Sequence, residues 1–135
     1  MILLDTSVLI NYFRNTNDES VLLLDEIIDR NIPYGICDFV YQELLQGTKS
    51  EKEFNILKEY LESLPFYYLN HGKESYEKAA LINFTCRKSG ITVRSTIDLL
   101  IAQIAIENNL FLLHSDKDFD FIATVIKELK IYRGM

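Results

Sequence analysis

The stretch Met1-Ile2-Leu3-Leu4-Asp5-Thr6 decides the fold of this chain. Consecutive apolar residues that run directly into a carboxylate are typical of a short strand buried on both faces, as in parallel sheets. A helical pattern of apolar residues follows at once, from Val8 to Phe13, so Asp5 marks the C-terminal end of that strand. Open α/β sheets bind ligands at this edge. We therefore predict that Asp5 is the first ligand of a divalent metal ion.

Strand and helix patterns alternate along the rest of the chain. We expect further strands at residues 34–37, 66–69, 111–113 and 131–132. Helices are expected at residues 7–14, 19–30, 38–46, 49–63, 73–89, 95–108 and 118–128. Asp38 is expected to cap the third of these helices, and Gly90 to end the fifth. The alternation predicts an α/β fold, a three-layer α/β/α domain with a central, mainly parallel sheet.

The composition is that of one ordinary globular domain. The chain has 135 residues, of which 48% are hydrophobic and 25% charged, and this is typical of a soluble protein. No apolar run approaches the roughly 18 residues that span a bilayer. No basic segment followed by an apolar stretch stands at the N-terminus, so we expect no export. Cys37 and Cys86 lack metal-type spacing. We expect both to be reduced, structural residues of a cytoplasmic protein that does not bind membranes.

The net charge of −6 argues against nucleic-acid binding, which normally requires a basic excess. That objection weakens if several acids gather around a bound cation, because the ion inverts the local field.

Four acids occupy positions from which such a group could form. Asp5, Glu43, Asp98 and Asp116 each lie just after a predicted strand or early in a predicted helix. Hard cations such as Mg²⁺ prefer oxygen ligands. A cluster of three or four carboxylates can hold one ion, or two about 4 Å apart, and activate a water for attack on a phosphodiester.

Each acid also has an ordinary structural interpretation. Asp5 and Asp116 could cap the helices that follow them, and Glu43 could be a solvated helix residue. Asp118 and Asp120 are expected to be first-turn acids favoured by the helix dipole.

Asp98 is the most informative of the acids. Its helix is apolar nearly all round, and a carboxylate in such a helix must be paired, hydrogen-bonded or metal-bound. Ser95 and Asp98 could form a capping box. For Asp98 we favour the metal-ligand interpretation, which is compatible with the cap.

A set of motifs carries a family resemblance: ILLDTS (2–7), Glu43, Gly90, DLLIA (98–102) and LLHSDKDF (112–119). In order and spacing over the whole chain, this set resembles the PIN-domain nucleases, and more narrowly the VapC-type toxins of prokaryotic toxin–antitoxin pairs. The resemblance implies a single PIN domain, residues 1–135, that is a ribonuclease using one or two Mg²⁺ or Mn²⁺ ions. It also implies an RNA substrate, with transfer RNA as a candidate, a VapB-like antitoxin and a homodimer.

The resemblance assigns roles position by position. Asp5 and Asp98 become the principal metal ligands, and Glu43 and Asp116 complete the catalytic site. The supporting positions are Thr6 beside the first acid, which it is expected to orient, Ser95, and Asp118, whose role stays open. Gln103 stands where the family has a small residue. The implied mechanism is attack of a metal-activated water on phosphorus, leaving 5′-phosphate and 3′-hydroxyl ends.

Basic residues in loops and at helix ends are candidates for holding RNA, although each could equally be a solvated surface charge. They are Lys49, Lys52, Arg87, Lys88 and Arg94. The Tyr- and Leu-rich segment 55–69 is a candidate partner surface, but ordinary core is the favoured interpretation.

Three other classes of protein share some features of this sequence. A haloacid-dehalogenase-type phosphatase needs a second Asp where this chain has Ser7. A response-regulator receiver needs a phospho-accepting Asp at the end of a central strand, and the middle of this chain offers glutamates on a helix instead. A catalytically silent PIN-like module that binds RNA or protein is the serious alternative. Such a binding module would not need several carboxylates in one site, where like charges raise each other's pKa.

Overall fold

The computed structural model describes residues 1–134 and contains one five-stranded sheet. Its strands are β1 (Ile2–Leu4), β2 (Tyr34–Cys37), β3 (Phe66–Tyr67), β4 (Phe111–Leu113) and β5 (Lys130–Ile131). The order across the sheet is β3-β2-β1-β4-β5, and every neighbouring pair is parallel. The prediction of a mainly parallel sheet is confirmed.

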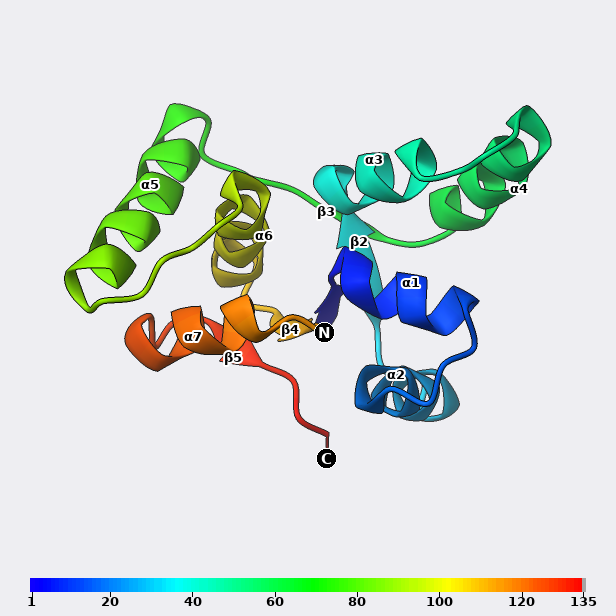
Figure 1. Cartoon of the computed structure of the whole chain (residues 1–135), viewed down its shortest axis with the longest axis horizontal. Helices are drawn as coiled ribbons and strands as arrows, with labels where there is room; N and C mark the ends of the chain where they lie inside the picture. Colours follow the sequence, from blue (N-terminus) through cyan, green and yellow to red (C-terminus); the bar gives the residue numbers. More distant parts are fainter. Residues whose placement is uncertain (135) are drawn as a thin grey trace.

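Helices cover both faces of this sheet (Figure 1). They are α1 (Thr6–Phe13), α2 (Glu19–Asp29), α3 (Asp38–Gln46), α4 (Glu51–Glu62), α5 (Lys73–Lys88), α6 (Thr96–Glu107) and α7 (Lys117–Val125). The chain moves from β1 outward to β3 and then crosses back to β4. Right-handed crossovers therefore place α1–α4 on one face and α5–α7 on the other. The three-layer α/β/α architecture is confirmed.

The reversal of strand order occurs between β1 and β4, which lie side by side in the centre of the sheet. All residues of β1 are buried, and so are Leu112 and Leu113 of β4. Seven consecutive residues of α6, from Leu99 to Ala105, are buried as well. The C-terminal ends of β1 and β4, at which ligands bind in such sheets, therefore lie beside a fully buried part of the core.

Several local predictions differ from the structure. β3 ends at Tyr67, two residues before the predicted end, and β5 spans Lys130–Ile131 in place of residues 131–132. Cys37 occupies the N-cap position of α3 and makes no side-chain cap bond, so Asp38 is the first helical residue and not the cap. The last helix ends at Val125, because Ile126 adopts an extended backbone conformation. This change of direction lets β5 pair with β4.

The favoured interpretation of the apolar residues on and after α4 as ordinary core holds only in part. Leu61 is buried, whereas Phe54, Ile56 and Tyr60 are 37%, 61% and 38% exposed. Leu57 and Leu64 are partly buried and pack against the core, so the apolar residues of this segment are divided between core and surface.

The cysteines behave as expected. Cys37 and Cys86 are buried and unpaired. Burial raises the pKa of the Cys37 thiol to about 11, so this thiol is protonated and unreactive at neutral pH. None of the helices in residues 1–134 combines the length and the apolar character needed to cross a bilayer.

Candidate metal centre

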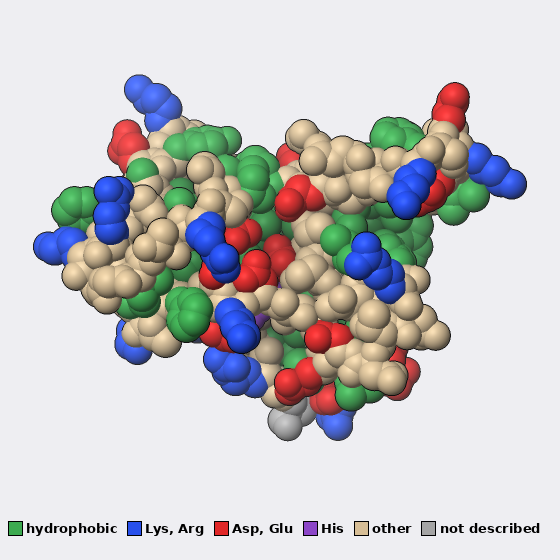
Figure 2. All heavy atoms as spheres, viewed as in Figure 1, with side chains coloured by type: hydrophobic (Ala, Val, Ile, Leu, Met, Phe, Trp, Pro, Cys, Tyr) green, Lys and Arg blue, Asp and Glu red, His purple; other side chains and the backbone are tan. Residues whose placement is uncertain are grey.

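Acidic side chains gather at the C-terminal edge of the sheet, beside the point where the strand order reverses. Asp5 follows β1 directly, and Asp116 lies three residues after the end of β4. Asp98 comes from the first turn of α6 and Glu43 from α3. Figure 2 shows acidic side chains in the hollow at the middle of this face. Together with Asp118 they are called the acidic edge below.

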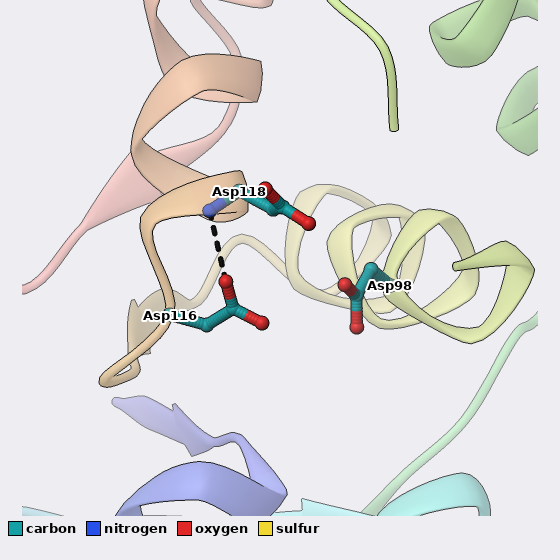
Figure 3. A group of neighbouring side chains, drawn as sticks. All are labelled: Asp98, Asp116 and Asp118. Atoms are coloured by element: carbon teal, nitrogen blue, oxygen red, sulfur yellow. Dashed lines mark hydrogen bonds between the residues drawn. The ribbon is translucent and has the colours of Figure 1, made fainter. Parts of the chain in front are cut away.

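Three of these acids come closest together (Figure 3). Asp98, Asp116 and Asp118 each offer a carboxylate oxygen, and the three oxygens lie within 4.8 Å of one another. Asp116 caps α7 and accepts a hydrogen bond of 3.0 Å from the backbone N–H of Asp118. The two interpretations of Asp116, helix cap and member of an acidic group, are therefore compatible.

The pKa of Asp98 reflects both its burial and its acidic neighbours. It is raised from 3.8 to about 7, first by burial and then by the charges of Asp5, Asp116, Asp118 and Glu43. A charge that shifts a pKa must lie close to the titrating group. Side chains that are 93 residues apart in the sequence, Asp5 and Asp98, thus repel each other in the folded protein.

Asp5 is 5% exposed and caps α1. Its Oδ2 atom accepts hydrogen bonds from the backbone N–H of Ser7 at 3.1 Å and from the Ser7 hydroxyl at 2.6 Å. Burial raises the pKa of Asp5, and the hydrogen bonds from Ser7 and from the backbone of Thr6 offset only part of this shift. Asp5 is therefore a carboxylate that is held rigidly and gains from a nearby cation.

Sequence reasoning missed the role of Ser7. Its hydroxyl donates to Asp5 and also accepts a 2.9 Å hydrogen bond from the backbone N–H of Ser115, so it ties the end of β1 to the segment after β4. The pattern Asp-x-Ser was available as a signal. It recurs at Asp18 and Ser20, where the serine N–H and hydroxyl both bind the aspartate that caps α2.

Thr6 contacts Asp5 through its backbone, and its hydroxyl binds another acid. The hydroxyl donates to Oε1 of Glu43 at 2.8 Å, and Glu43 is otherwise exposed. Thr6 therefore fixes the acid contributed by α3, and Ser7 fixes the acid that follows β1.

The segment before α6 also differs from the expectation. Ser95 occupies the N-cap position but makes no side-chain cap bond, so the capping-box interpretation of Ser95 and Asp98 is wrong. Asp118 is bound by Arg94, whose Nη2 atom lies 3.1 Å from Oδ1. Asp120 contacts His114 and Arg133 instead.

The predicted RNA-binding cations do not form one patch. Lys49 precedes α4 and Lys52 lies on it, whereas Arg87 and Lys88 lie in the last turn of α5. Figure 1 shows α4 and α5 at opposite ends of the molecule. Within residues 1–134, Arg94 is the one Lys or Arg side chain that forms an ion pair with the acidic edge.

Comparison with known sequences gives one family and named relatives. The family model described as PIN domain matches residues 2–125. The protein called Ribonuclease VapC11 from Mycobacterium tuberculosis is 31% identical over 126 residues, which are 93% of each chain. VapC ribonuclease Mb1587 from Mycobacterium bovis is similar to the same extent.

Solved structures share the fold. VapBC2 from Rickettsia felis, bound to a DNA fragment from its promoter, has a chain that matches with a TM-score of 0.73 at 19% identity, over 98% of both chains. A chain of VapBC-1 from nontypeable Haemophilus influenzae matches with a TM-score of 0.72 at 24% identity, over 98% of this chain and 97% of that one.

Proposed function

The chain belongs to the PIN domain family and is of the VapC type, and from this premise we propose that it is an endoribonuclease that uses one or two Mg²⁺ or Mn²⁺ ions. Residues 1–135 would form its single catalytic domain. The observation that carries the proposal is the acidic edge itself, where carboxylates from four separate segments meet and where oxygens of Asp98, Asp116 and Asp118 lie within 4.8 Å of one another. Burial, and then the charges of the other acids, raise the pKa of Asp98 to about 7.

The donor set fits a hard divalent cation. The side-chain donors are carboxylate oxygens, which Mg²⁺ and Mn²⁺ prefer, and three of them lie within 4.8 Å of one another. Crowded carboxylates destabilise a fold unless a cation neutralises them. A binding module without catalysis would have no reason to bear this cost, so the edge favours the nuclease over the catalytically silent alternative.

The residues would divide the work as follows. Asp5, Asp98 and Asp116 would hold the ion, with Ser7 fixing the orientation of Asp5. Glu43, oriented by Thr6, would complete the edge on its exposed side. When bound, a divalent ion would supply Lewis-acid chemistry, polarising a phosphate oxygen and making a water molecule a better nucleophile at neutral pH. Asp118 offers the third oxygen of the close group but is also paired with Arg94, so it would support the site from the side of α7.

Purified protein is expected to cleave RNA with Mg²⁺ or Mn²⁺ and to stop when the metal is chelated. Activity should return when the metal is restored, because the carboxylates remain in place. Gel analysis of a labelled RNA, with end-group mapping for 5′-phosphate and 3′-hydroxyl, makes the measurement. Cleavage that persists in excess chelator would refute the metal-dependent mechanism, and 2′,3′-cyclic phosphate ends would refute attack by water. Transfer RNA is the first substrate to try.

The partner that we infer is a VapB-like antitoxin, because the structures that share this fold include VapBC complexes. An exposed groove of about 570 Å³ is available for it. The groove lies between the end of α1 and α4, and its lining includes the apolar side chains of Phe13, Ile56, Leu57 and Tyr60. The cytoplasm, where RNA and antitoxin are made, is the compartment that this function requires.

Replacing Ile56 with Asp should weaken the complex with a small protein encoded beside the gene, because a charge in an apolar groove has no partner. Leu22→Asp is the matched control, since Leu22 is equally exposed but lies on α2 outside the groove. Co-purification and light scattering make the measurement. Equal binding by both variants would show that the antitoxin does not bind in this groove. The same light-scattering measurement tests the proposed homodimer, which would be refuted if the isolated protein had the mass of one chain at every concentration.

A further inference from the structure

Arg94 lies beside the acidic edge, in the loop between α5 and α6. Its Nε and Nη2 atoms lie 3.4 and 3.1 Å from the two carboxylate oxygens of Asp118. Asp118 is almost fully buried, whereas 76% of the Arg94 side chain is exposed. A guanidinium carries five N–H donors in a planar fork. Asp118 therefore holds one edge of the fork, and the other edge is available to a ligand.

An exposed aromatic ring lies one helical turn after Asp118. Phe121 is 50% exposed, and residues three apart on a helix share a face. Phe121 therefore flanks the Arg94–Asp118 pair. A hollow of about 360 Å³ adjoins these three side chains and is also lined by Gly90, Ile91 and Thr92. This volume falls within the roughly 300–1,000 Å³ of small-ligand pockets.

The hollow combines the two features that bind single-stranded nucleic acid, a cation for the phosphate and an aromatic face for the base. The acidic edge repels the phosphates of RNA, and a fixed positive charge at its margin compensates locally. Arg94 is suited to this task because its own geometry is fixed by a buried acid. The other candidate cations lie on α4, before it, or at the end of α5.

We propose that this hollow is a nucleotide subsite next to the phosphodiester that is cleaved. Arg94 binds the phosphate of that nucleotide, and the base stacks on Phe121 beside Ile91. Asp118 is a positioning residue that orients Arg94. The inference rests on the proposed function for the identity of the ligand, which is single-stranded RNA, but it assigns roles to Arg94 and Phe121, which the metal centre does not use.

The test is the affinity of fluorescent oligoadenylate and oligouridylate, measured by anisotropy in chelator so that no cleavage occurs. Arg94→Ala should weaken binding of both about ten-fold and lower the dependence of affinity on salt by about one charge. Phe121→Ala should weaken oligoadenylate about ten-fold and oligouridylate less, with no change in salt dependence, because stacking is uncharged and stronger for a purine. Phe121→Trp should restore binding.

A matched control exists on α5. Phe84 is 55% exposed and lies 5.5 Å from the ammonium of Lys88, so it offers a ring and a cation away from the acidic edge. Phe84→Ala should leave RNA affinity unchanged. Arg94→Lys, which keeps the charge and loses the fork, should fall between wild type and Arg94→Ala, and serves if the alanine variant is poorly folded.

Further outcomes decide the proposal. Unchanged RNA affinity in Arg94→Ala together with tighter Mn²⁺ binding would overturn it, because Arg94 would then be a resident counter-ion of the metal site. Unchanged affinity in Phe121→Ala would overturn the stacking. RNA binding that depends on both residues in a protein that never cleaves would support the subsite while refuting the nuclease. Normal cleavage with an unchanged KM in both variants would support the nuclease while refuting the subsite.

Discussion

Replacing Asp98 with Asn is expected to abolish RNA cleavage and leave the fold intact. The substitution keeps the size of the side chain but removes the charge that a divalent ion requires. Metal ions contribute several kcal/mol of transition-state stabilisation, so the rate should fall at least about a thousand-fold. Asp5→Asn should have the same effect, and because Asn caps helices as well as Asp does, α1 should stay intact. Initial rates on a defined RNA and circular dichroism make the comparison.

The control for these variants is Asp25→Asn, which removes an acid from the exposed face of α2. It changes the net charge by the same amount, so any loss of RNA affinity or rate from overall charge appears in it too. Affinity for Mn²⁺ provides a second readout, and it should fall in Asp5→Asn and Asp98→Asn alone. A variant at position 5 or 98 that retained full activity would disprove the ligand assignment.

The metal-free protein is expected to lose stability as the pH rises from about 4 to about 7. The folded-state pKa of Asp98 is raised from 3.8 to about 7, so the folded protein binds the proton more tightly than the unfolded chain does. Stability is therefore greatest below the unfolded pKa and falls until the folded pKa is passed. The full shift corresponds to about 4 kcal/mol. Asp98 is only half-buried, and solvent screening reduces the loss to about 2 kcal/mol.

Urea unfolding at several pH values in chelator measures this loss, and Asp98→Asn isolates the part due to Asp98. The variant should be more stable than wild type by about 2 kcal/mol at neutral pH and nearly equal to it at about pH 4. Burial raises the pKa of Asp5 as well, so this group contributes with the same sign. Mg²⁺ should restore wild-type stability, by about 2.7 kcal/mol at a hundred times its Kd. A wild type that stays as stable as Asp98→Asn at neutral pH in chelator would contradict the crowding of these charges.

Most of the fold follows from local patterns in the sequence. The strands β1 and β4 are short apolar runs, and α6 is apolar on nearly all sides. These patterns predict elements that are buried in the centre of the domain. The boundaries that failed lie where tertiary pairing overrides periodicity. Ile126 leaves the helix because β5 pairs with β4. On α4, Phe54, Ile56 and Tyr60 stay exposed, whereas Leu57 and Leu61 pack into the core.

Part of the candidate site also follows from the sequence. A carboxylate directly after a buried strand, as in Asp5, or inside an apolar helix, as in Asp98, is conspicuous in the sequence because burial of a charge requires a reason. The sequence alone therefore determined which acids to examine and at which edge of the sheet. It also held the Asp-x-Ser pattern that marks Ser7.

Only the tertiary structure decided how the side chains pair. Thr6 binds Glu43 across 37 residues, and Arg94 binds Asp118 across 24. The hydroxyl of Ser7 bridges the strand ends across 108 residues. Such contacts depend on the register of the strands and the rotation of each packed helix. Neither leaves a trace in local periodicity, because a hydrogen bond requires a distance to within a few tenths of an ångström, whereas a sequence pattern specifies only the face on which a residue lies.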